Sequence, residues 1–398
     1  MISVSEAKHL IYKSCFTLPP VLVPLSEAAG LVLAADVHSA IDTPPFHQSN
    51  VDGYAFSFDS LGQNPLQITA NIPAGFTENT SISAGCAARI FTGAPLPHGA
   101  DTVVMQEFVT AENGFLSIQD TKLTRGANTR LKGSQTSKNQ LVVQKETQLF
   151  AGVIGFLAGV GIAEVWVYPK PRISLVITGQ ELITPPQPLQ FGQIYESNSF
   201  ALKAALADGH LSPLSINFCA DNAEQTFETI QNNLHDTDIL LITGGISVGD
   251  YDFVANALQR CGVETVFYKV AQRPGKPLFF GKKDNTLVFA LPGNPASVLT
   301  CFYEYVVPVL RAFMGKTPDG YAPLRKAALT HEVKKVPHLT HFMRAKLQGN
   351  EAQVLNNQES YKMNAYIDAD CFAVLEAGVE TYQRGELVEI HVLNQCWN

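Results

Sequence analysis

The stretch DILLITGGISVGDYD, residues 238–252, decides how the central part of this 398-residue chain folds. The apolar run 239–242 stops at the glycines 244 and 245, and a helix-like pattern begins at Phe253. A buried strand that ends in glycines and feeds a helix leaves backbone N–H groups free at the carboxyl edge of a sheet, where anions dock. An ordinary strand–loop–helix turn has the same pattern. The anion-binding interpretation assigns substrate contacts to Gly244, Gly245, Ser247, Gly249 and Asp250.

Two other predicted strands end in similar turns. The strand at 173–177 is followed by TGQEL (178–182), and the strand at 287–291 is followed by PGNPAS (292–297). Carboxyl ends of neighbouring parallel strands share one edge, so we expect the three turns to line a single crevice. The turn at 292–297 begins a helix. This position favours anion binding, but it also fits simple helix initiation by proline. Its candidate substrate contacts are Pro292, Gly293 and Asn294, with Ser297 in the first helical turn.

Two kinds of charge accompany these turns. Arg273 and Lys276 lie on the proline-stiffened loop RPGKP (273–277), which can present a fixed positive pocket to an oxyanion or can be a solvated turn. Carboxylate oxygens suit Mg²⁺, although any one acid also fits a surface or helix-capping role. The candidate Mg²⁺ ligands are Glu181, Asp221, Asp250 and Asp252.

Composition excludes several classes of protein. The hydrophobic content of 46% with 16% charged residues is typical of a well-packed chain, and 398 residues are too many for one core. A net charge of −8, with no long Lys/Arg tract, argues against a nucleic-acid partner. Seven dispersed cysteines fit reduced thiols in the cytoplasm, and the apolar run 149–163 is too short to span a membrane. Scattered histidines give no Ser/His/Asp constellation, so acyl chemistry is not expected.

The order of elements predicts a multidomain α/β plus β protein. Residues 1–40 have a helical pattern, and short β runs separated by Pro/Gly/Asn turns fill 42–148. From Pro171 strands and helices alternate, which predicts a doubly wound parallel sheet. After 317–320 short strands return and predict a small β-barrel or sandwich.

Two turns in the β region carry polar groups. Asp52 precedes Gly53, and Thr92 precedes Gly93. Taken alone, each fits a hairpin turn. They could act on the α/β crevice only if a second subunit brought them there.

Eight segments, in this order, resemble the molybdopterin molybdenumtransferase family, which includes bacterial MoeA and the E domain of gephyrin. They are PPFHQSNVDGYA (44–55), IFTGAPLPHGADTVVMQE (90–107), GANTRLKG (126–133), ISLVITGQEL (173–182), GQIYESNS (192–199), TGGISVGDYD (243–252), RPGKP (273–277) and LPGNPAS (291–297).

The resemblance implies four domains and an elongated homodimer. The domains would be a helical linker (1–41 and 140–168), an inserted β domain (42–139), an α/β molybdopterin-binding domain (169–317) and a C-terminal β-barrel (318–398). The active site would lie between the α/β domain of one subunit and the β domain of the other, which supplies the second subunit that Asp52 and Thr92 need.

The resemblance also implies the reaction. Molybdate would be inserted into adenylyl-molybdopterin with Mg²⁺-dependent cleavage and release of AMP. A molybdopterin adenylyltransferase and apo-molybdoenzymes would be partner proteins. The implied catalytic residues are Asp52, Thr92, Glu181, Asp252 and Lys276, and the implied molybdate-binding residues are Arg273, Lys276, Ser297, Arg344 and Ser360.

The chain departs from the family pattern at four positions. Gln135 and Gln180 stand where acids are common, Arg273 stands where lysine is usual, and Asn50 stands where small residues are frequent. The two glutamines favour a catalytically weakened homologue that binds molybdopterin or acts as a scaffold. The residues that favour the enzyme are Lys276, Arg344, Asp252 and Asp52. A third interpretation, the adenylyltransferase step itself, does not explain the inserted β domain and the barrel.

Overall fold

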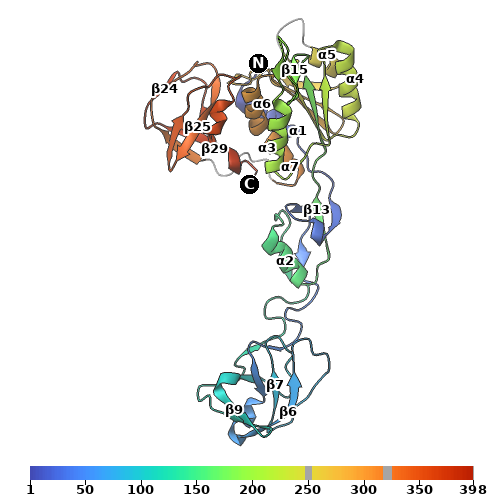
Figure 1. The fold of residues 1–398 in the computed structure, drawn as a ribbon, viewed down its shortest axis with the longest axis vertical. Helices are drawn as coiled ribbons and strands as arrows, with labels where there is room; N and C mark the ends of the chain where they lie inside the picture. The colour runs from blue at the N-terminus through green and yellow to red at the C-terminus, as the bar shows by residue number, and fades with distance from the viewer. Residues whose placement is uncertain (247–252, 317–324, 398) are drawn as a thin grey trace. The chain divides into compact units, whose positions relative to one another are not determined.

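The computed structural model describes residues 1–246, 253–316 and 325–397. The chain divides into two compact units (Figure 1). The first comprises Met1–Val21 and Tyr168–Asn398, and the second comprises Leu22–Val167. The four-domain division expected from the sequence is finer than this and stays a prediction.

A six-stranded sheet with the order β17-β14-β18-β22-β21-β19 forms the centre of the first unit. Its strands are β14 (Ile173–Thr178), β17 (Ser215–Cys219), β18 (Ile239–Thr243), β19 (Glu264–Tyr268), β21 (Phe279–Lys283) and β22 (Thr286–Leu291). β17, β14, β18 and β22 are parallel, whereas β21 and β19 are antiparallel to their neighbours.

The expectation of a wholly parallel sheet is therefore wrong at one edge. Only two residues connect β21 to β22, and a parallel crossover needs a dozen or more. Asp284 in this connection has a φ of 51°, which lets the chain reverse in a hairpin. This hairpin was not predicted, because the expected pattern contained only strands separated by helices.

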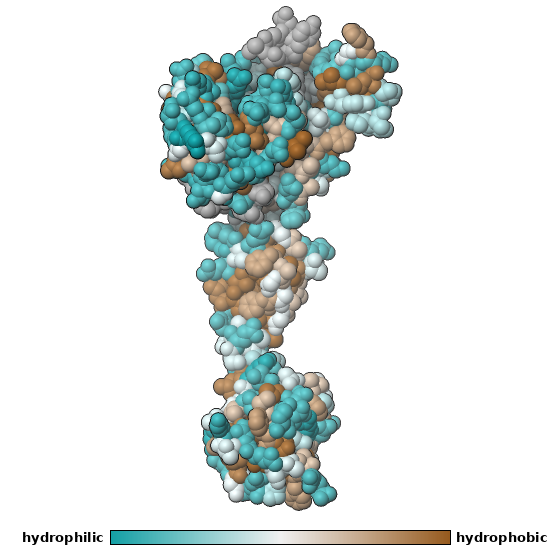
Figure 2. Space-filling view, turned by 60° about the vertical axis from the view of Figure 1, so that its left-hand side comes forward, coloured by the Kyte–Doolittle hydropathy of each residue, from teal (hydrophilic) through white to brown (hydrophobic). Residues whose placement is uncertain are grey.

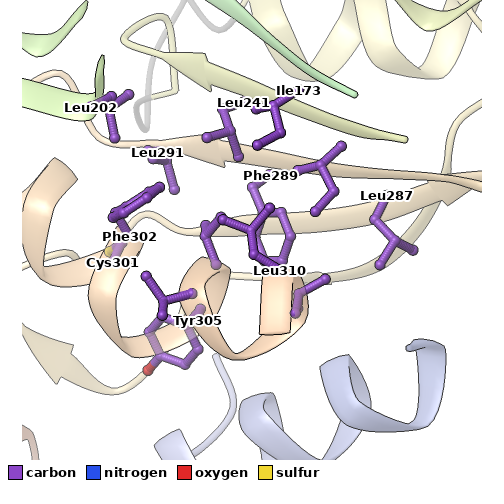
Figure 3. Close-up of a cluster of buried hydrophobic side chains, with 14 of the residues drawn as sticks. Ile173, Leu202, Leu241, Leu287, Phe289, Leu291, Cys301, Phe302, Tyr305 and Leu310 are labelled. Carbon is purple, nitrogen blue, oxygen red and sulfur yellow. The ribbon is translucent and has the colours of Figure 1, made fainter. Parts of the chain in front are cut away.

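Helices cover both faces of the sheet, as the doubly wound prediction requires. They are α1 (Val4–Ser14), α3 (Asn198–Asp208), α4 (Ala223–Leu234), α5 (Phe253–Arg260), α6 (Pro295–Cys301) and α7 (Val307–Phe313). Successive residues of a strand face opposite sides. Leu241 packs with α1, α3, α6 and α7 (Figure 3), and Leu240 packs with α4 and α5.

A π-helical segment, Phe302–Val306, joins α6 to α7. Pro308 has no N–H to donate to the preceding turn, which explains why the regular helical ladder is interrupted there. By length and composition the 19-residue run Pro295–Phe313 is apolar enough to cross a membrane, and it is entirely buried inside the unit.

The C-terminal part of the first unit contains a closed five-stranded barrel. The strands β25, β26, β23, β29 and β27 follow one another, and β27 pairs back with β25. A short strand from the preceding α/β region, β20, pairs in parallel with β25. The bounds are β20 (Gln272–Arg273), β23 (Arg325–Leu329), β25 (Thr340–Gln348), β26 (Glu351–Val354), β27 (Cys371–Leu375) and β29 (Leu387–Val392).

The second unit contains a six-stranded sheet with the order β8-β5-β7-β6-β10-β9. Its strands are β5 (Gly53–Phe56), β6 (Leu66–Ile72), β7 (Cys86–Ile90), β8 (Thr102–Met105), β9 (Val109–Glu112) and β10 (Phe115–Ile118). The same unit holds a three-stranded sheet and one helix, namely β1 (Val21–Pro24), β2 (Val32–Leu33), β13 (Glu164–Tyr168) and α2 (Ala151–Gly159).

The helical pattern expected over 1–40 is wrong beyond residue 14. The Oγ of Ser3 accepts a hydrogen bond from the Glu6 N–H at 3.1 Å and starts α1, but the helix ends at Ser14. Pro19, Pro20 and Pro24 cannot donate helical hydrogen bonds, so the chain continues as short strands.

Candidate functional site

The carboxyl ends of three parallel strands open into one cavity of about 630 Å³. Ile177 of β14 pairs with Thr243 of β18, which pairs with Leu291 of β22, so the three strands end side by side. The following turns contribute Gly244, Gly245, Pro292, Gly293 and Asn294 to the cavity wall. The expectation that the three turns line a single crevice is confirmed.

The turn after β18 requires glycine at two positions, because of both the available space and the backbone conformation. Gly244 has a φ of +82°, and a Cβ there would lie 2.7 Å from the carbonyl oxygen of Thr178. Gly245 has a φ of +63°, and its Cβ would lie 2.6 Å from Cγ2 of Val254. A side chain at either position would be strained and would push the turns apart.

Asn198, at the start of α3, also lines this cavity and was not among the predicted site residues. Its Nδ2 donates to the carbonyl oxygen of Gly293 at 2.9 Å, which fixes the orientation of the amide. Its buried Oδ1 has no partner among the described residues. The signal was present in the segment GQIYESNS, where the asparagine follows a turn and begins a helix.

The predicted Mg²⁺ ligands are only partly placed. Glu181 and Asp221 both line the cavity, so the structure brings these two residues to one site. Among the described residues no group of three or more His, Cys, Asp or Glu side chains could hold a metal ion. The predicted residues Ser247, Gly249, Asp250 and Asp252 lie outside the described residues.

A hydrogen bond joins this cavity to the C-terminal barrel region. Nδ2 of Asn294 donates to Oγ of Ser360 at 2.9 Å, and the N–H of Ala296 donates to the carbonyl oxygen of Ser360 at 3.1 Å. The neighbouring Tyr361 lines the same cavity. Ser360, predicted to bind molybdate, thus contacts Asn294, predicted to bind the pterin substrate.

The two cations of the RPGKP loop are exposed. Arg273 lines a second cavity, of about 680 Å³, together with barrel residues such as Met343 and Gln358. Pro277 lines the first cavity, so the loop contributes to both. Ser297, in contrast, is buried in the first turn of α6.

Arg344 of β25 is completely buried. Its Nη2 donates to the carbonyl oxygens of Asn357 and Glu359, at 2.8 and 3.3 Å, and its guanidinium lies 5.5 Å from the centre of the Tyr366 ring. Burial lowers the pKa of Arg344, but a guanidinium stays charged in proteins. Within the described ranges its Nε and Nη1 have no hydrogen-bond partner, so this cation has unused donors.

Asp52 and Thr92 meet in the second unit. One carboxylate oxygen of Asp52 accepts from both the N–H and the hydroxyl of Thr92, each at 2.8 Å. These two bonds, with a smaller contribution from the charge of Arg89, hold the pKa of Asp52 below its usual value. The turn is tight, because a Cβ on Gly53 would lie 1.9 Å from the carbonyl oxygen of Val104.

Three family models match almost the whole chain. Residues 2–161 match the MoeA N-terminal region (domains I and II), residues 174–312 match a "probable molybdopterin binding domain", and residues 326–393 match the MoeA C-terminal region (domain IV). A molybdopterin molybdenumtransferase from Nostoc sp. is 38% identical over 78% of this chain and 73% of its own length. One from Haemophilus influenzae is 33% identical over 99% of both chains.

The chain belongs to the molybdopterin molybdenumtransferase (MoeA) family. Solved structures agree with this assignment. A molybdopterin biosynthesis MoeA protein from Pyrococcus horikoshii has a TM-score of 0.84 and 30% identity, with 99% of each chain covered. A second structure from that organism has a TM-score of 0.77 and 27% identity, and covers 98% of this chain and 100% of its own.

Gln135 and Gln180, which stand where the resemblance leads us to expect acids, are both exposed. The backbone N–H of Gln135 donates to the carbonyl oxygen of Thr43 at 2.9 Å. Gln180 directly precedes Glu181, which lines the cavity.

Proposed function

We propose that this chain inserts molybdate into adenylyl-molybdopterin and releases AMP, as a step of molybdenum cofactor biosynthesis. Curated relatives that cover nearly the whole chain are molybdopterin molybdenumtransferases. The observation that carries the proposal is the hydrogen bond between Asn294 and Ser360, because it joins the cavity at the strand ends to the part of the barrel held by Arg344. A reaction between a pterin pyrophosphate and an oxyanion needs two such adjoining anion sites.

The cavity at the strand ends would bind the nucleotide-activated pterin. Glycines without side chains let backbone groups approach a pyrophosphate closely, and the N-terminus of α6 adds a favourable dipole. Gly244, Gly245 and Gly293 would lie against the phosphates, with Asn294 beside them. This role also extends to Ser247, Gly249 and Asp250, which lie outside the described residues.

Molybdate would bind near Arg273, Lys276 and Arg344. The unused Nε and Nη1 donors of Arg344 support this assignment, because a buried cation with free N–H groups favours an anion beside it. Ser297 and Ser360 flank the same end of α6, Ser297 in its first turn and Ser360 through the Ala296 N–H.

Mg²⁺ would be held by Glu181 and Asp221, with Asp250 and Asp252 as further ligands. The donor set fits, because Mg²⁺ prefers carboxylate oxygens and phosphate oxygens together. When bound, the ion would neutralise charge on the pyrophosphate while its phosphoanhydride bond is cleaved. Lys276 would stabilise developing negative charge beside it.

Asp52 and Thr92 would complete the site of the partner subunit in a homodimer. Their mutual hydrogen bonds keep the Asp52 carboxylate charged and oriented. An apolar surface on the second unit supports self-association (Figure 2). Leu22, Phe150 and Trp166 are large hydrophobic side chains with 47%, 64% and 50% exposure, a pattern typical of an interface.

Molybdate-dependent AMP release tests the function. Purified protein is incubated with adenylyl-molybdopterin and Mg²⁺, and AMP is quantified with and without molybdate. The proposal requires AMP release that rises with molybdate concentration, and Lys276→Ala should lower it by on the order of 100-fold. Lys13→Ala, at an exposed lysine of α1 that does not line the cavity, is the matched control.

AMP release that ignores molybdate would reject the proposed reaction. Release that persists in Lys276→Ala would reject that residue's role and leave the reaction standing. Beyond Gln135 and Gln180, nothing in the described residues favours the scaffold alternative. A molybdopterin adenylyltransferase as supplier, apo-molybdoenzymes as recipients and a cytoplasmic location remain parts of the proposal.

A further inference from the structure

Gln272 lies directly before the cationic RPGKP loop, and its side chain is completely buried. Its Nε2 donates to the carbonyl oxygens of Pro274 and Gly275, at 3.2 and 3.1 Å, and lies 3.5 Å from Sγ of Cys301. One amide group therefore satisfies two carbonyls of the loop from inside the protein.

The other end of this amide is fixed by Tyr305. Its hydroxyl donates to Oε1 of Gln272, and the ring belongs to the core cluster shown with Cys301 in Figure 3. Burial raises the pKa of Tyr305 well above its ordinary value, so the phenol remains protonated and able to donate. Because the phenol supplies a donor, the amide oxygen must face it and the NH₂ group must face the loop.

The backbone of the loop leaves little room for another arrangement. The N–H of Val270 donates to the carbonyl oxygen of Lys276 at 3.0 Å and closes the loop. Gly275 has a φ of +86°, and a Cβ there would lie 2.5 Å from Sγ of Cys301 and 2.9 Å from Nε2 of Gln272. The loop is thus packed directly against the glutamine and the end of α6.

The two cations themselves are not held by their side chains. Arg273 and Lys276 are exposed, and neither side chain forms an ion pair or hydrogen bond with any residue that the structure describes. The position of their charges therefore depends on the backbone of the loop. That backbone is held by Gln272.

We propose that Gln272 is a positioning residue that sets the affinity of this site for molybdate without touching it. The proposal rests on the proposed function, because it takes Arg273 and Lys276 to be molybdate ligands. A fixed loop presents both cations to one oxyanion without a further entropic cost on binding. A loosened loop would still carry both charges but would hold them together only part of the time.

The test compares three variants with the wild type. Gln272→Met keeps a similar unbranched volume and removes the amide, and Tyr305→Phe removes only the hydroxyl that orients it. Thr286→Val is the matched control, because the buried Thr286 hydroxyl at the start of β22 donates to a backbone carbonyl, that of Thr237, at 2.7 Å and forms no hydrogen bond with the loop. Thermal midpoint, the Kd for molybdate alone by calorimetry, and KM and kcat for AMP release are measured.

The positioning role predicts a separation of KM from kcat. Gln272→Met should raise the Kd and KM for molybdate about tenfold, equivalent to about 1.4 kcal/mol, with kcat changed less than about twofold. Tyr305→Phe should raise them by a smaller factor, about threefold. Thr286→Val should lower the thermal midpoint and leave both constants at the wild-type value.

Each contrary result has a distinct meaning. Wild-type molybdate affinity in Gln272→Met, or an equal loss in Thr286→Val, would overturn the positioning role. If Gln272→Met does not fold, Tyr305→Phe decides, and wild-type affinity there rejects the proposal. Absence of molybdate-dependent AMP release in the wild type rejects the proposed function, whereas the calorimetric comparison still tests Gln272.

Discussion

Nδ1 of His391 lies 2.7 Å from Oε1 of Glu304, and both side chains are buried. Nε2 of the same ring lies 2.6 Å from Oε1 of Glu389, and Nζ of Lys8 lies 2.8 Å from Oε2 of Glu304. With carboxylates at both nitrogens, the imidazole is held as the charged imidazolium. The network ties α1, the π-helical segment and the barrel strand β29 together.

This network predicts a stability that falls at alkaline pH. Burial alone would lower the pKa of His391, but Glu304 and Glu389 raise it above its ordinary value. The stabilisation that the charged His391 provides is therefore fully present below about pH 6.5, the ordinary pKa of histidine. It is lost as the pH rises through the raised pKa of His391. We expect the free energy of unfolding, measured with urea, to decrease between pH 6 and pH 9.

The variant His391→Gln should flatten this pH dependence and cost about 3 kcal/mol at pH 6, because it leaves the buried Glu304 with one fewer cation. His331→Gln, at an exposed histidine of the barrel region, is the control and should keep the wild-type profile. An unchanged slope in His391→Gln would show that another group causes the pH dependence.

The second prediction concerns Asp52. Thr92→Val removes the hydroxyl bond and keeps the N–H bond, so the pKa of Asp52 should rise toward its usual value. The carboxyl carbon can be followed by NMR through an acid titration. AMP release should fall about tenfold in Thr92→Val and on the order of 100-fold in Asp52→Asn. Full activity in Asp52→Asn would remove this pair from the site.

The third prediction concerns Arg344. Lysine at this position keeps the charge but loses the planar guanidinium, in which Nη2 donates to two backbone carbonyls while Nε and Nη1 stay available to an anion. We expect Arg344→Lys to raise the KM for molybdate at least about tenfold. Arg325→Lys, which also loses an arginine–carbonyl contact in the barrel, is the control and should keep the wild-type KM. Equal losses in both variants would indicate a general defect of the barrel.

The fourth prediction concerns the turn beside Asp52. Gly53→Ala places a Cβ 1.9 Å from a backbone oxygen, so the sheet must move and the free energy of unfolding should fall by about 2 kcal/mol or more. Gly62→Ala, where a Cβ meets nothing within 4 Å, should change it by less than about 0.5 kcal/mol. Urea denaturation of both variants checks this, and equal stabilities would contradict the steric argument.

The predictions from the sequence were most accurate where a single sequence pattern determined the structure. The apolar runs that became β14, β18 and β22 were placed within about one residue, because each is continuous and bounded by glycine or proline. Their shared edge followed from the parallel order alone, so the cavity could be predicted before any contact was known.

Other features depended on contacts that a linear pattern does not contain. β1 and β2, two short strands that follow α1, both pair with β13, which lies far away along the chain. The Asn294–Ser360 bond joins residues 66 positions apart, and Asn198 and Gln272 are fixed by bonds to Gly293 and Tyr305, 95 and 33 positions away. Composition and periodicity carry no signal for such pairs.

The short strand β20 belongs by position to the α/β region but lies in the hydrogen-bonded ladder of the barrel. The N–H of Thr340 donates to the carbonyl oxygen of Ala271 at 3.0 Å. In a chain truncated before the barrel, the RPGKP segment would therefore lack its neighbour β25. The edge of β20 would then be unpaired and exposed. The α/β region and the barrel are consecutive in the sequence but share this ladder, so a chimera that takes the barrel from a relative must also take the matching β20 segment.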